Sequence, residues 1–392
     1  MTTTKNNEHN KLNFSSEREQ SQACLNSAEH EKNQGRKVLN VPNLRFKEFQ
    51  GEWEKKRLEE CVEFLDGLRK PIKSEDRKSE QGLYPYYGAS GIIDYIDGYI
   101  FDGEYILLSE DGANIIDRNY RVAFIAKGKI WVNNHAHVLQ PYDGFDINFL
   151  SETLERLNYA VYNTGTTMPK LNQEVCRNIN LKIPTTKEQN KIGNLLSLLN
   201  ERISTQNKII DKLQSLIKGI GKQLFMDNQN WRTVKIGELL RIGNGKDYKH
   251  LSIGKIPVYG TGGQMLLVND YLYDGESVCI GRKGTIDTPM FLKGKFWTVD
   301  TLFYTYDFKD VLPKFCYYLF LQINWKLYNE GTGVPSLSKS TIENIKVKIQ
   351  SFEQQHKICS ILDCYEHKTN NEEQILELYH SEKQYLLRQM FI

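Results

Sequence analysis

The heptad GTTMPKL at residues 165–171 returns as GTGVPSL at residues 331–337, 166 positions later. Four of the seven residues are identical. The heptad contains no nucleophile beside a base, no cluster of metal ligands and no phosphate-binding loop. A stretch without reactive groups that occurs twice indicates a duplicated structural unit rather than an active site. The heptads therefore predict that the chain contains two copies of a longer unit.

Ordered matches extend outward from the heptad in both directions. Upstream, YG at 87–88 matches YG at 259–260, and DGE at 102–104 matches DGE at 274–276, both at an offset of 172. Downstream, INLKIPTTKEQNKI (179–192) matches IKVKIQSFEQQHKI (345–358) at an offset of 166. The changes of offset mark loops of different length. A repeat of this size is a whole domain with its tail, because solenoid repeats have only about 20–50 residues.

Each copy predicts the same order of secondary structure. Short β-type runs separated by Gly and Asp-Gly turns come first, and helical runs at 148–162 and 313–328 follow them. After the heptad come a short apolar strand and a long helix, predicted at 187–225 in the first copy. Its apolar residues alternate spacings of four and three from Ile192 to Leu224, interrupted by Gln206, which implies a partner helix.

The second long helix keeps this pattern from Ile358 to Met390 but is polar at three of its ten seam positions. We expect it to pack more loosely or against another protein. The predicted fold class is α+β, with two pseudo-repeated mixed α/β domains, each followed by a long helix. The predicted boundaries are 41–184 and 227–350 for the domains and 185–226 and 351–392 for the helices. Residues 1–40 are polar without periodicity and are predicted to be disordered.

Composition narrows the class of protein. The formal net charge is only +2, so local basic patches rather than the whole chain would bind a polyanion. No apolar run approaches the roughly 20 residues that cross a bilayer, and residues 1–10 lack the apolar core of a signal peptide. The seven cysteines include no Cys-x-x-Cys pair, which is typical of reduced thiols. We predict a cytoplasmic protein with no membrane partner.

A search for catalytic motifs finds none. The chain has no Gly-x-x-x-x-Gly-Lys-Ser/Thr loop, no dinucleotide fingerprint and no Asn/Asp-Pro-Pro-Tyr/Phe motif of amino-methyltransferases. His135 and His137 would lie on one strand face, but their matched residues are Thr301 and Phe303. A mechanism shared by the two copies cannot use them. We predict no catalytic residue and no metal ligand.

Local positive charge lies in matched loops, GLRKPIKSEDRK (67–78) and GNGKDYKHLSIGK (243–255), with GRKG at 281–284 in the second copy. Such loops suit phosphate contacts with some reading of base edges, although a solvated loop is nearly as consistent with the sequence. Arg282 suits guanine O6 and N7, whereas the matched Glu110 suits a cytosine amino group, so the copies should read different bases.

The predicted DNA-binding residues are Arg69, Lys70, Lys73, Ser90, Glu110, Asn114, Asn133, Thr166, Thr167 and Lys170 in the first copy, and Lys246, Tyr248, Lys249, Thr261, Gln264, Arg282, Lys283, Thr332, Ser336 and Lys339 in the second.

Together these features resemble the specificity subunits of type I restriction-modification systems. The resemblance rests on VPNLRFKEFQGEWEKKRLEE (41–60), on YPYYGASG and IPVYGTGG, on the two heptads, and on IPTTKEQNKI running into a long helix; it covers everything after about residue 41. Two departures are a longer polar N-terminal extension and IQSFEQQ (349–355), which lacks the proline of IPTTKEQ and puts the start of the last helix in doubt.

The resemblance implies a non-catalytic DNA reader. Two target-recognition domains would each read one half of a split, asymmetric site, and the long helices would pack as an antiparallel coiled coil between them. The implied partners are double-stranded DNA, two methyltransferase subunits and two restriction-motor subunits, with S-adenosylmethionine, ATP and Mg on those subunits and no cofactor in this chain. The alternatives are a stand-alone DNA methyltransferase or nuclease, and a coiled-coil scaffold without a DNA role.

Overall fold

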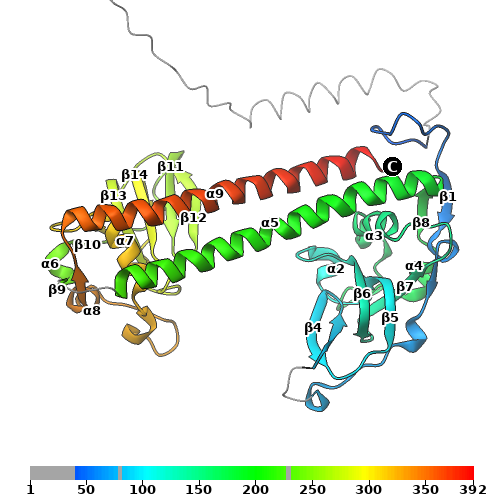
Figure 1. Ribbon diagram of the computed structural model, residues 1–392, viewed down its shortest axis with the longest axis horizontal. Helices are drawn as coiled ribbons and strands as arrows, with labels where there is room; N and C mark the ends of the chain where they lie inside the picture. The colour runs from blue at the N-terminus through cyan, green and yellow to red at the C-terminus, as the bar shows by residue number, and fades with distance from the viewer. Residues whose placement is uncertain (1–39, 78–81, 227–230) are drawn as a thin grey trace, which may run out of the picture. The chain divides into compact units, whose positions relative to one another are not determined.

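The computed structural model describes residues 40–77, 82–226 and 231–392 and divides into two compact units (Figure 1). The first unit comprises the chain up to Leu198 together with Lys383–Ile392, and the second comprises Leu199–Glu382. Each unit therefore contains part of both long helices. The extension predicted to be disordered, 1–40, lies outside the described residues except for its last residue.

The first unit is built on a six-stranded sheet in the order β2-β7-β5-β6-β3-β4, with a separate antiparallel pair β1-β8. Only β3 and β6 are parallel neighbours in the larger sheet. Its strands are β1 (Glu54–Arg57), β2 (Val62–Phe64), β3 (Tyr84–Gly88), β4 (Gly91–Ile96), β5 (Phe101–Ser109), β6 (Ala123–Val132), β7 (Ala136–Pro141) and β8 (Asn180–Ile183), and its short helices are α2 (Asn114–Asp117), α3 (Ile147–Glu155) and α4 (Gln173–Arg177).

The second unit repeats this plan in the order β10-β15-β13-β14-β11-β12, with the pair β16-β9. Its strands are β9 (Arg232–Lys235), β10 (Arg241–Asn244), β11 (Ile253–Gly260), β12 (Gly263–Val268), β13 (Tyr273–Gly281), β14 (Met290–Thr298), β15 (Leu302–Tyr306) and β16 (Lys346–Ile349), and its short helices are α6 (Ile236–Leu239), α7 (Pro313–Gln322) and α8 (Lys339–Asn344). Each strand takes the place of its counterpart. The predicted duplication and the α+β class are confirmed.

The repeated DGE triplets pair with a second repeated triplet, KGK at 127–129 and 293–295, across neighbouring strands. In the first unit Gly103 pairs with Gly128 across β5 and β6, and Glu104 and Lys127 form an ion pair beside them at 3.0 Å. Gly128 has a φ of 78°, a conformation that favours glycine. The second unit has the same pairing and an ion pair of the same length, 3.0 Å, between Glu276 and Lys293. These repeats therefore serve the fold.

The helical runs predicted at 148–162 and 313–328 are each broken in the structure. After α3 and α7 the chain turns and then forms a single 3-10 turn, at Tyr159–Tyr162 and Trp325–Tyr328. The Tyr159 hydroxyl donates to the carbonyl oxygen of Leu154 at 2.8 Å, and the indole nitrogen of Trp325 donates to that of Phe320 at 2.9 Å. A buried aromatic residue thus satisfies a carbonyl at the end of the helix and stops it.

The long helices begin at matched positions, α5 (Thr186–Met226) and α9 (Phe352–Gln389). The missing proline does not shift the start of α9, because a matched glutamine fixes both starts. Gln189 Nε2 donates to the carbonyl oxygen of Pro184 at 3.0 Å, and Gln355 Nε2 donates to that of Gln350 at 2.9 Å. Among the described residues no helix is both long enough and apolar enough to span a membrane.

Within the second unit α5 and α9 pack antiparallel, as predicted (Figure 1). Ile220 and Leu224 of α5 belong to the same apolar cluster as Ile358 and Leu362 near the start of α9. Further along, Gln206 Nε2 donates to the carbonyl oxygen of Glu372 at 2.9 Å and to its Oε2 at 2.6 Å. Gln206 and Glu372 are matched positions of the two copies, 166 residues apart, and they meet across the two helices.

In the first unit the opposite ends of the same helices pack together. Ile192 and Leu196 near the start of α5 share an apolar cluster with Met390 and Phe391, which follow the last residue of α9. Met390 is the last predicted seam position. It is buried, as a seam residue should be, but it lies one residue beyond the end of α9.

The polar seam positions of α9 have partners within their own units. Besides Glu372, Thr369 Oγ1 donates to the carbonyl oxygen of Tyr365 at 3.0 Å, and Lys383 Nζ lies 3.0 Å from Oε1 of the buried Glu152 on α3. These positions make specific contacts with the fold.

Candidate nucleic-acid interface

The first heptad forms a tight loop tied by Asn163. Asn163 Oδ1 accepts hydrogen bonds from the backbone nitrogens of Gly165 and Lys170, both at 2.9 Å. A Cβ atom on Gly165 would lie 1.8 Å from the carbonyl oxygen of Met168, so glycine is required there. Thr166 and Thr167 are exposed between these tied ends.

The second heptad forms the same loop. Asn329 Oδ1 accepts from the backbone nitrogens of Gly331 and Ser336, both at 2.9 Å, and a Cβ on Gly331 would lie 2.1 Å from the carbonyl oxygen of Val334. Thr332 is exposed. The heptad is repeated because the loop geometry requires it.

We expect Gly331→Ala to lower the free energy of unfolding of the second unit by about 1–3 kcal/mol, because the backbone must strain to clear the new methyl group. Gly333→Ala is the matched control, since a Cβ there meets nothing within 4 Å; its effect should stay within about 0.5 kcal/mol. Denaturant unfolding followed by tryptophan fluorescence compares the two. Equal stabilities would contradict this account of the loop.

Each heptad loop is joined to the segment that follows the central strand. In the first unit the nitrogen of Gly112 donates to the carbonyl oxygen of Pro169 at 3.0 Å, and the nitrogen of Leu171 donates to that of Glu110 at 2.7 Å. The matching bonds of the second unit run from Gly284 to Pro335 and from Leu337 to Arg282, both at 2.9 Å. The same backbone frame therefore places Glu110 and Arg282 beside the loops.

The basic loops are held to the sheets by a matched tryptophan. Trp131 Nε1 donates to the carbonyl oxygen of Lys70 at 2.6 Å, and Trp297 Nε1 donates to that of Lys246 at 2.8 Å. Because the contact uses the backbone, the lysine side chains stay exposed.

The predicted DNA-binding residues differ in exposure. Twelve are exposed: Lys70, Lys73, Ser90, Thr166, Thr167, Lys170, Lys246, Lys249, Gln264, Arg282, Lys283 and Thr332. Seven are half-buried, namely Arg69, Glu110, Asn114, Tyr248, Thr261, Ser336 and Lys339, and Asn133 is buried.

Some of these residues are brought together and others are not. In the first unit Arg69 and Lys170 both reach Glu110, at 2.7 and 3.4 Å, and in the second an isolated backbone bridge joins Lys283 to Ser336. Asn114 instead binds the backbone of Tyr120 in its own loop, at 2.8 and 3.1 Å. Lys339 lies apart as the first residue of α8.

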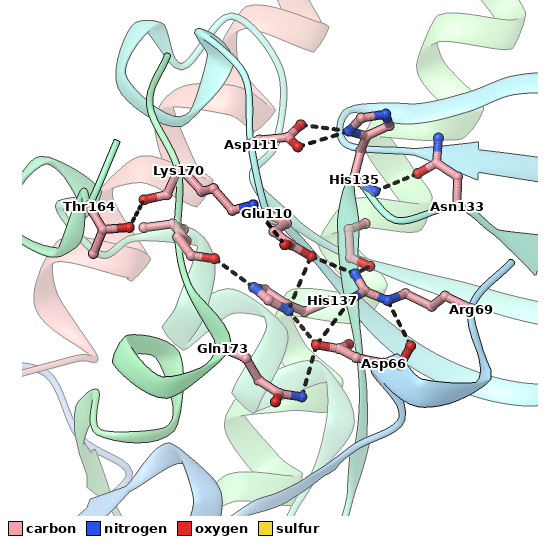
Figure 2. A network of polar contacts seen from close by, with 12 residues as sticks. Asp66, Arg69, Glu110, Asp111, Asn133, His135, His137, Thr164, Lys170 and Gln173 are labelled. Atoms are coloured by element: carbon pink, nitrogen blue, oxygen red, sulfur yellow. Dashed lines mark hydrogen bonds and ion pairs between the residues drawn. The ribbon is translucent and has the colours of Figure 1, made fainter. Parts of the chain in front are cut away.

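Arg69 and Glu110 belong to an internal network (Figure 2). Arg69 Nη1 lies 2.7 Å from Glu110 Oε2 and 2.8 Å from the carbonyl oxygen of Ala136. The Arg69 and Glu110 side chains are only 12% and 15% exposed. A base edge could engage either group only by displacing this pair.

His137 lies at the centre of that network. Its Nδ1 is 2.6 Å from Asp66 Oδ2 and its Nε2 is 2.8 Å from the carbonyl oxygen of Leu171. Burial alone lowers the pKa of His137, but the hydrogen bonds to Asp66 and Cys176, together with the charges of those two groups, outweigh it and raise the pKa to about 10. Both ring nitrogens donate, so this is a buried imidazolium that ties the heptad loop to the basic loop.

Asp66, Glu110 and His137 also have ligand atoms within 4.8 Å of one another, a spacing that could hold a metal ion. A metal-binding histidine needs a nitrogen with a free lone pair. Both nitrogens of His137 face acceptors, and the Arg69 guanidinium already neutralises Glu110. The cluster therefore fits an ion-pair network better than a metal site.

The second unit replaces this network with different chemistry. Asn244 pairs with Phe303 across β10 and β15, where the first unit has Asp66 and His137. Arg282, matched to Glu110, is exposed, and its guanidinium carbon lies 5.9 Å from the centre of the Phe303 ring. One unit thus has a closed network where the other presents a cation to solvent.

The imidazolium predicts that the stability of the first unit falls as pH rises. The folded pKa of His137, about 10, is above the unfolded value of 6.5, so its stabilisation is complete below about pH 6.5 and is lost toward pH 10. We expect a loss of at least about 1 kcal/mol between pH 7 and 9.5. The double variant Asp66→Asn/His137→Phe, which imports the pair of the second unit, should lose this dependence. Urea unfolding at several pH values measures the free energy of unfolding of both proteins. If this free energy fell with pH equally in the unmodified chain and in the double variant, the prediction would be contradicted.

Asp66 and Gln173 are members of the network that the sequence analysis missed; Gln173 Nε2 donates to Asp66 Oδ2 at 3.0 Å. Comparison of the copies could not reveal Asp66, because its counterpart is Asn244. Nor could it reveal His137, whose counterpart is Phe303.

Comparisons with known proteins agree with this architecture. A family model described as the type I restriction modification DNA specificity domain matches residues 50–215 and again 228–378. A putative type I restriction enzyme specificity subunit of Haemophilus influenzae is 30% identical over 352 residues, covering 82% of this chain and 89% of that protein. The MjaVIII type I restriction enzyme specificity subunit of Methanocaldococcus jannaschii is 24% identical over 403 residues, covering 84% and 92%.

The crystal structure of a type I restriction-modification S subunit from M. genitalium has a similar fold, with a TM-score of 0.66 at 18% identity over 90% of this chain and 99% of that one. The family match covers both copies and most of the chain. The chain therefore belongs to the family of type I restriction-modification DNA specificity subunits.

Proposed function

We propose that the chain reads a split, asymmetric DNA site, with each unit reading one half, while methyltransferase and restriction-motor subunits dock on it. The proposal rests on one observation: the two units have the same backbone hydrogen bonds around the heptad loop, but residues of opposite charge at the same positions. Glu110 and Asp111 in the first unit are replaced by Arg282 and Lys283 in the second. One frame with two sets of donors and acceptors should read two different sequences.

In the second unit Arg282 is the reader. Its backbone nitrogen donates to the carbonyl oxygen of Thr301 at 2.8 Å. This hydrogen bond fixes the backbone position from which the exposed side chain extends. A guanidinium suits the two acceptors of guanine in the major groove. Lys246, Lys249 and Lys283, all exposed, would contact phosphates on either side.

In the first unit the exposed lysines of the basic loop and the heptad loop, Lys70, Lys73 and Lys170, would make the phosphate contacts. Arg69 and Glu110 support these loops through their internal pair. Base reading in this unit then falls to side chains that are exposed beside the network.

The long helices would hold the two readers apart. The 41 residues of α5 span about 60 Å, whereas modules reading one DNA face a turn apart lie about 34 Å from centre to centre. The coiled coil is thus long enough to fix an unread spacer between the half-sites. S-adenosylmethionine, ATP and Mg would act on the two methyltransferase and two restriction-motor subunits.

Salt dependence of DNA binding tests the proposal. The chain with its methyltransferase subunits should bind duplex DNA carrying its site, and log Kd should rise with log salt at a slope of about 0.9 per phosphate contact. A scaffold without a DNA role predicts no such slope. Calorimetry of the isolated chain with S-adenosylmethionine tests the stand-alone methyltransferase, which would bind it, and an incubation with DNA tests the nuclease, which would cut it.

A further inference from the structure

We propose that His135 reads a base edge in the half-site bound by the first unit. The inference rests on the proposed function and names a specificity residue for it. His135 lies in the turn between β6 and β7, and its side chain is 50% exposed, whereas that of His137 two residues later is 1% exposed. The two histidines therefore have separate roles, one in the network and one at the surface.

The carboxylate of Asp111 orients the ring of His135 (Figure 2). Nδ1 of His135 lies 2.9 Å from both carboxylate oxygens. An ionised carboxylate can only accept, so Nδ1 carries a proton, and in that tautomer of the imidazole Nε2 is an acceptor. Nε2 has no hydrogen-bond partner among the residues that the structure describes. An acceptor held toward solvent suits the exocyclic amino group of adenine or cytosine in the major groove.

The backbone of His135 is also held firmly. Its nitrogen donates to Oδ1 of the buried Asn133 at 2.8 Å, and its carbonyl oxygen accepts from the nitrogen of Glu110 at 2.9 Å. Asp111 in turn forms a backbone bridge with Lys170 of the heptad loop. These contacts place His135 beside exposed basic residues and restrict its conformation before DNA binds. Little conformational entropy is then lost on binding, as a specificity residue requires.

The second unit keeps this backbone frame and changes the side chains. The nitrogen of Arg282 donates to the carbonyl oxygen of Thr301 at 2.8 Å, which corresponds to the bond between Glu110 and His135. The pair of His135 and Asp111 is replaced by Thr301 and Lys283. The missing counterpart excludes His135 from any chemistry that the copies share. A residue that reads only one half-site is expected to have no counterpart in the other unit.

The test is to map methylated sites produced by the full chain in complex with its methyltransferase subunits. His135→Ala should relax one base position of one half-site, reducing discrimination there by roughly tenfold or more. Every other position should be unchanged. Asp111→Asn, which lets the ring take either tautomer, should relax the same position more weakly. Thr301→Ala is the matched control and should leave that half-site unchanged.

An unchanged motif with His135→Ala would overturn the proposal, as would equal weakening at every position, which marks a purely structural role. If that variant fails to assemble, Asp111→Asn decides alone: relaxation at a single position supports the proposal, and an unchanged motif overturns it. Failure of the proposed function would be visible separately, because the unmodified complex would then show no split motif.

Discussion

Replacing Arg282 with alanine should lower the affinity of the complex for its own site by about 1–3 kcal/mol, because the contact between a guanidinium and guanine is lost. The loss should be confined to one base position of the second half-site. Arg282 is exposed and has no carboxylate partner among the described residues, so the change leaves no buried charge unpaired. Binding titrations with every single-base variant of the site, at one fixed salt concentration, measure the effect.

Two control variants distinguish recognition of a base from electrostatic attraction to the DNA phosphates. Lys283→Ala should weaken binding to all sequences alike and reduce the salt slope by about one. Arg232→Ala removes another exposed arginine, which pairs with Asp310 at 2.7 Å outside the loops, and should change neither quantity. If Arg282→Ala behaved like Lys283→Ala, Arg282 would be a phosphate contact and the assignment of reading to it would be wrong.

Lengthening both long helices should change the spacer without changing either half-site. One heptad inserted in each helix at matched positions, after Ile203 and after Thr369, adds roughly 10 Å to the coiled coil. This corresponds to an unread spacer longer by up to about three base pairs at 3.4 Å each. The apolar seam continues because a heptad preserves its register. Mapping of methylated sites measures the spacer directly.

The matched control lengthens α5 alone. That insertion moves Ile192 and Leu196 out of register with Met390 and Phe391 at the end of α9, so we expect specific methylation to be lost rather than shifted. A spacer of unchanged length in the doubly lengthened chain would show that the helices do not set the separation of the readers.

Features carried by both copies could be predicted from the sequence. The order of strands and helices along the chain, the long helices and the heptad loops all follow from residues that recur at a fixed offset. Gly165 and Gly331, for example, are both required by the same backbone geometry. The broken helical runs could not be predicted, since Tyr159 and Trp325 are helix-compatible in isolation. Only their position in the core lets them satisfy the carbonyls that end α3 and α7.

The site was less predictable than the fold, for a physical reason. Charge and loop position identified the exposed lysines but could not show that Arg69 and Glu110 pair with each other from 41 positions apart. The same comparison that reveals scaffold residues also hides those that differ between copies. Asp66, His137 and His135 all fall in that group, and a reader of one half-site is expected to fall there too.

The most direct measurement of the central claim is a genome-wide map of methylated bases made by the complex containing this chain. The account predicts one motif made of two different half-sites separated by an unread spacer of constant length. A single continuous motif, two identical half-sites, or a spacer of variable length would contradict it.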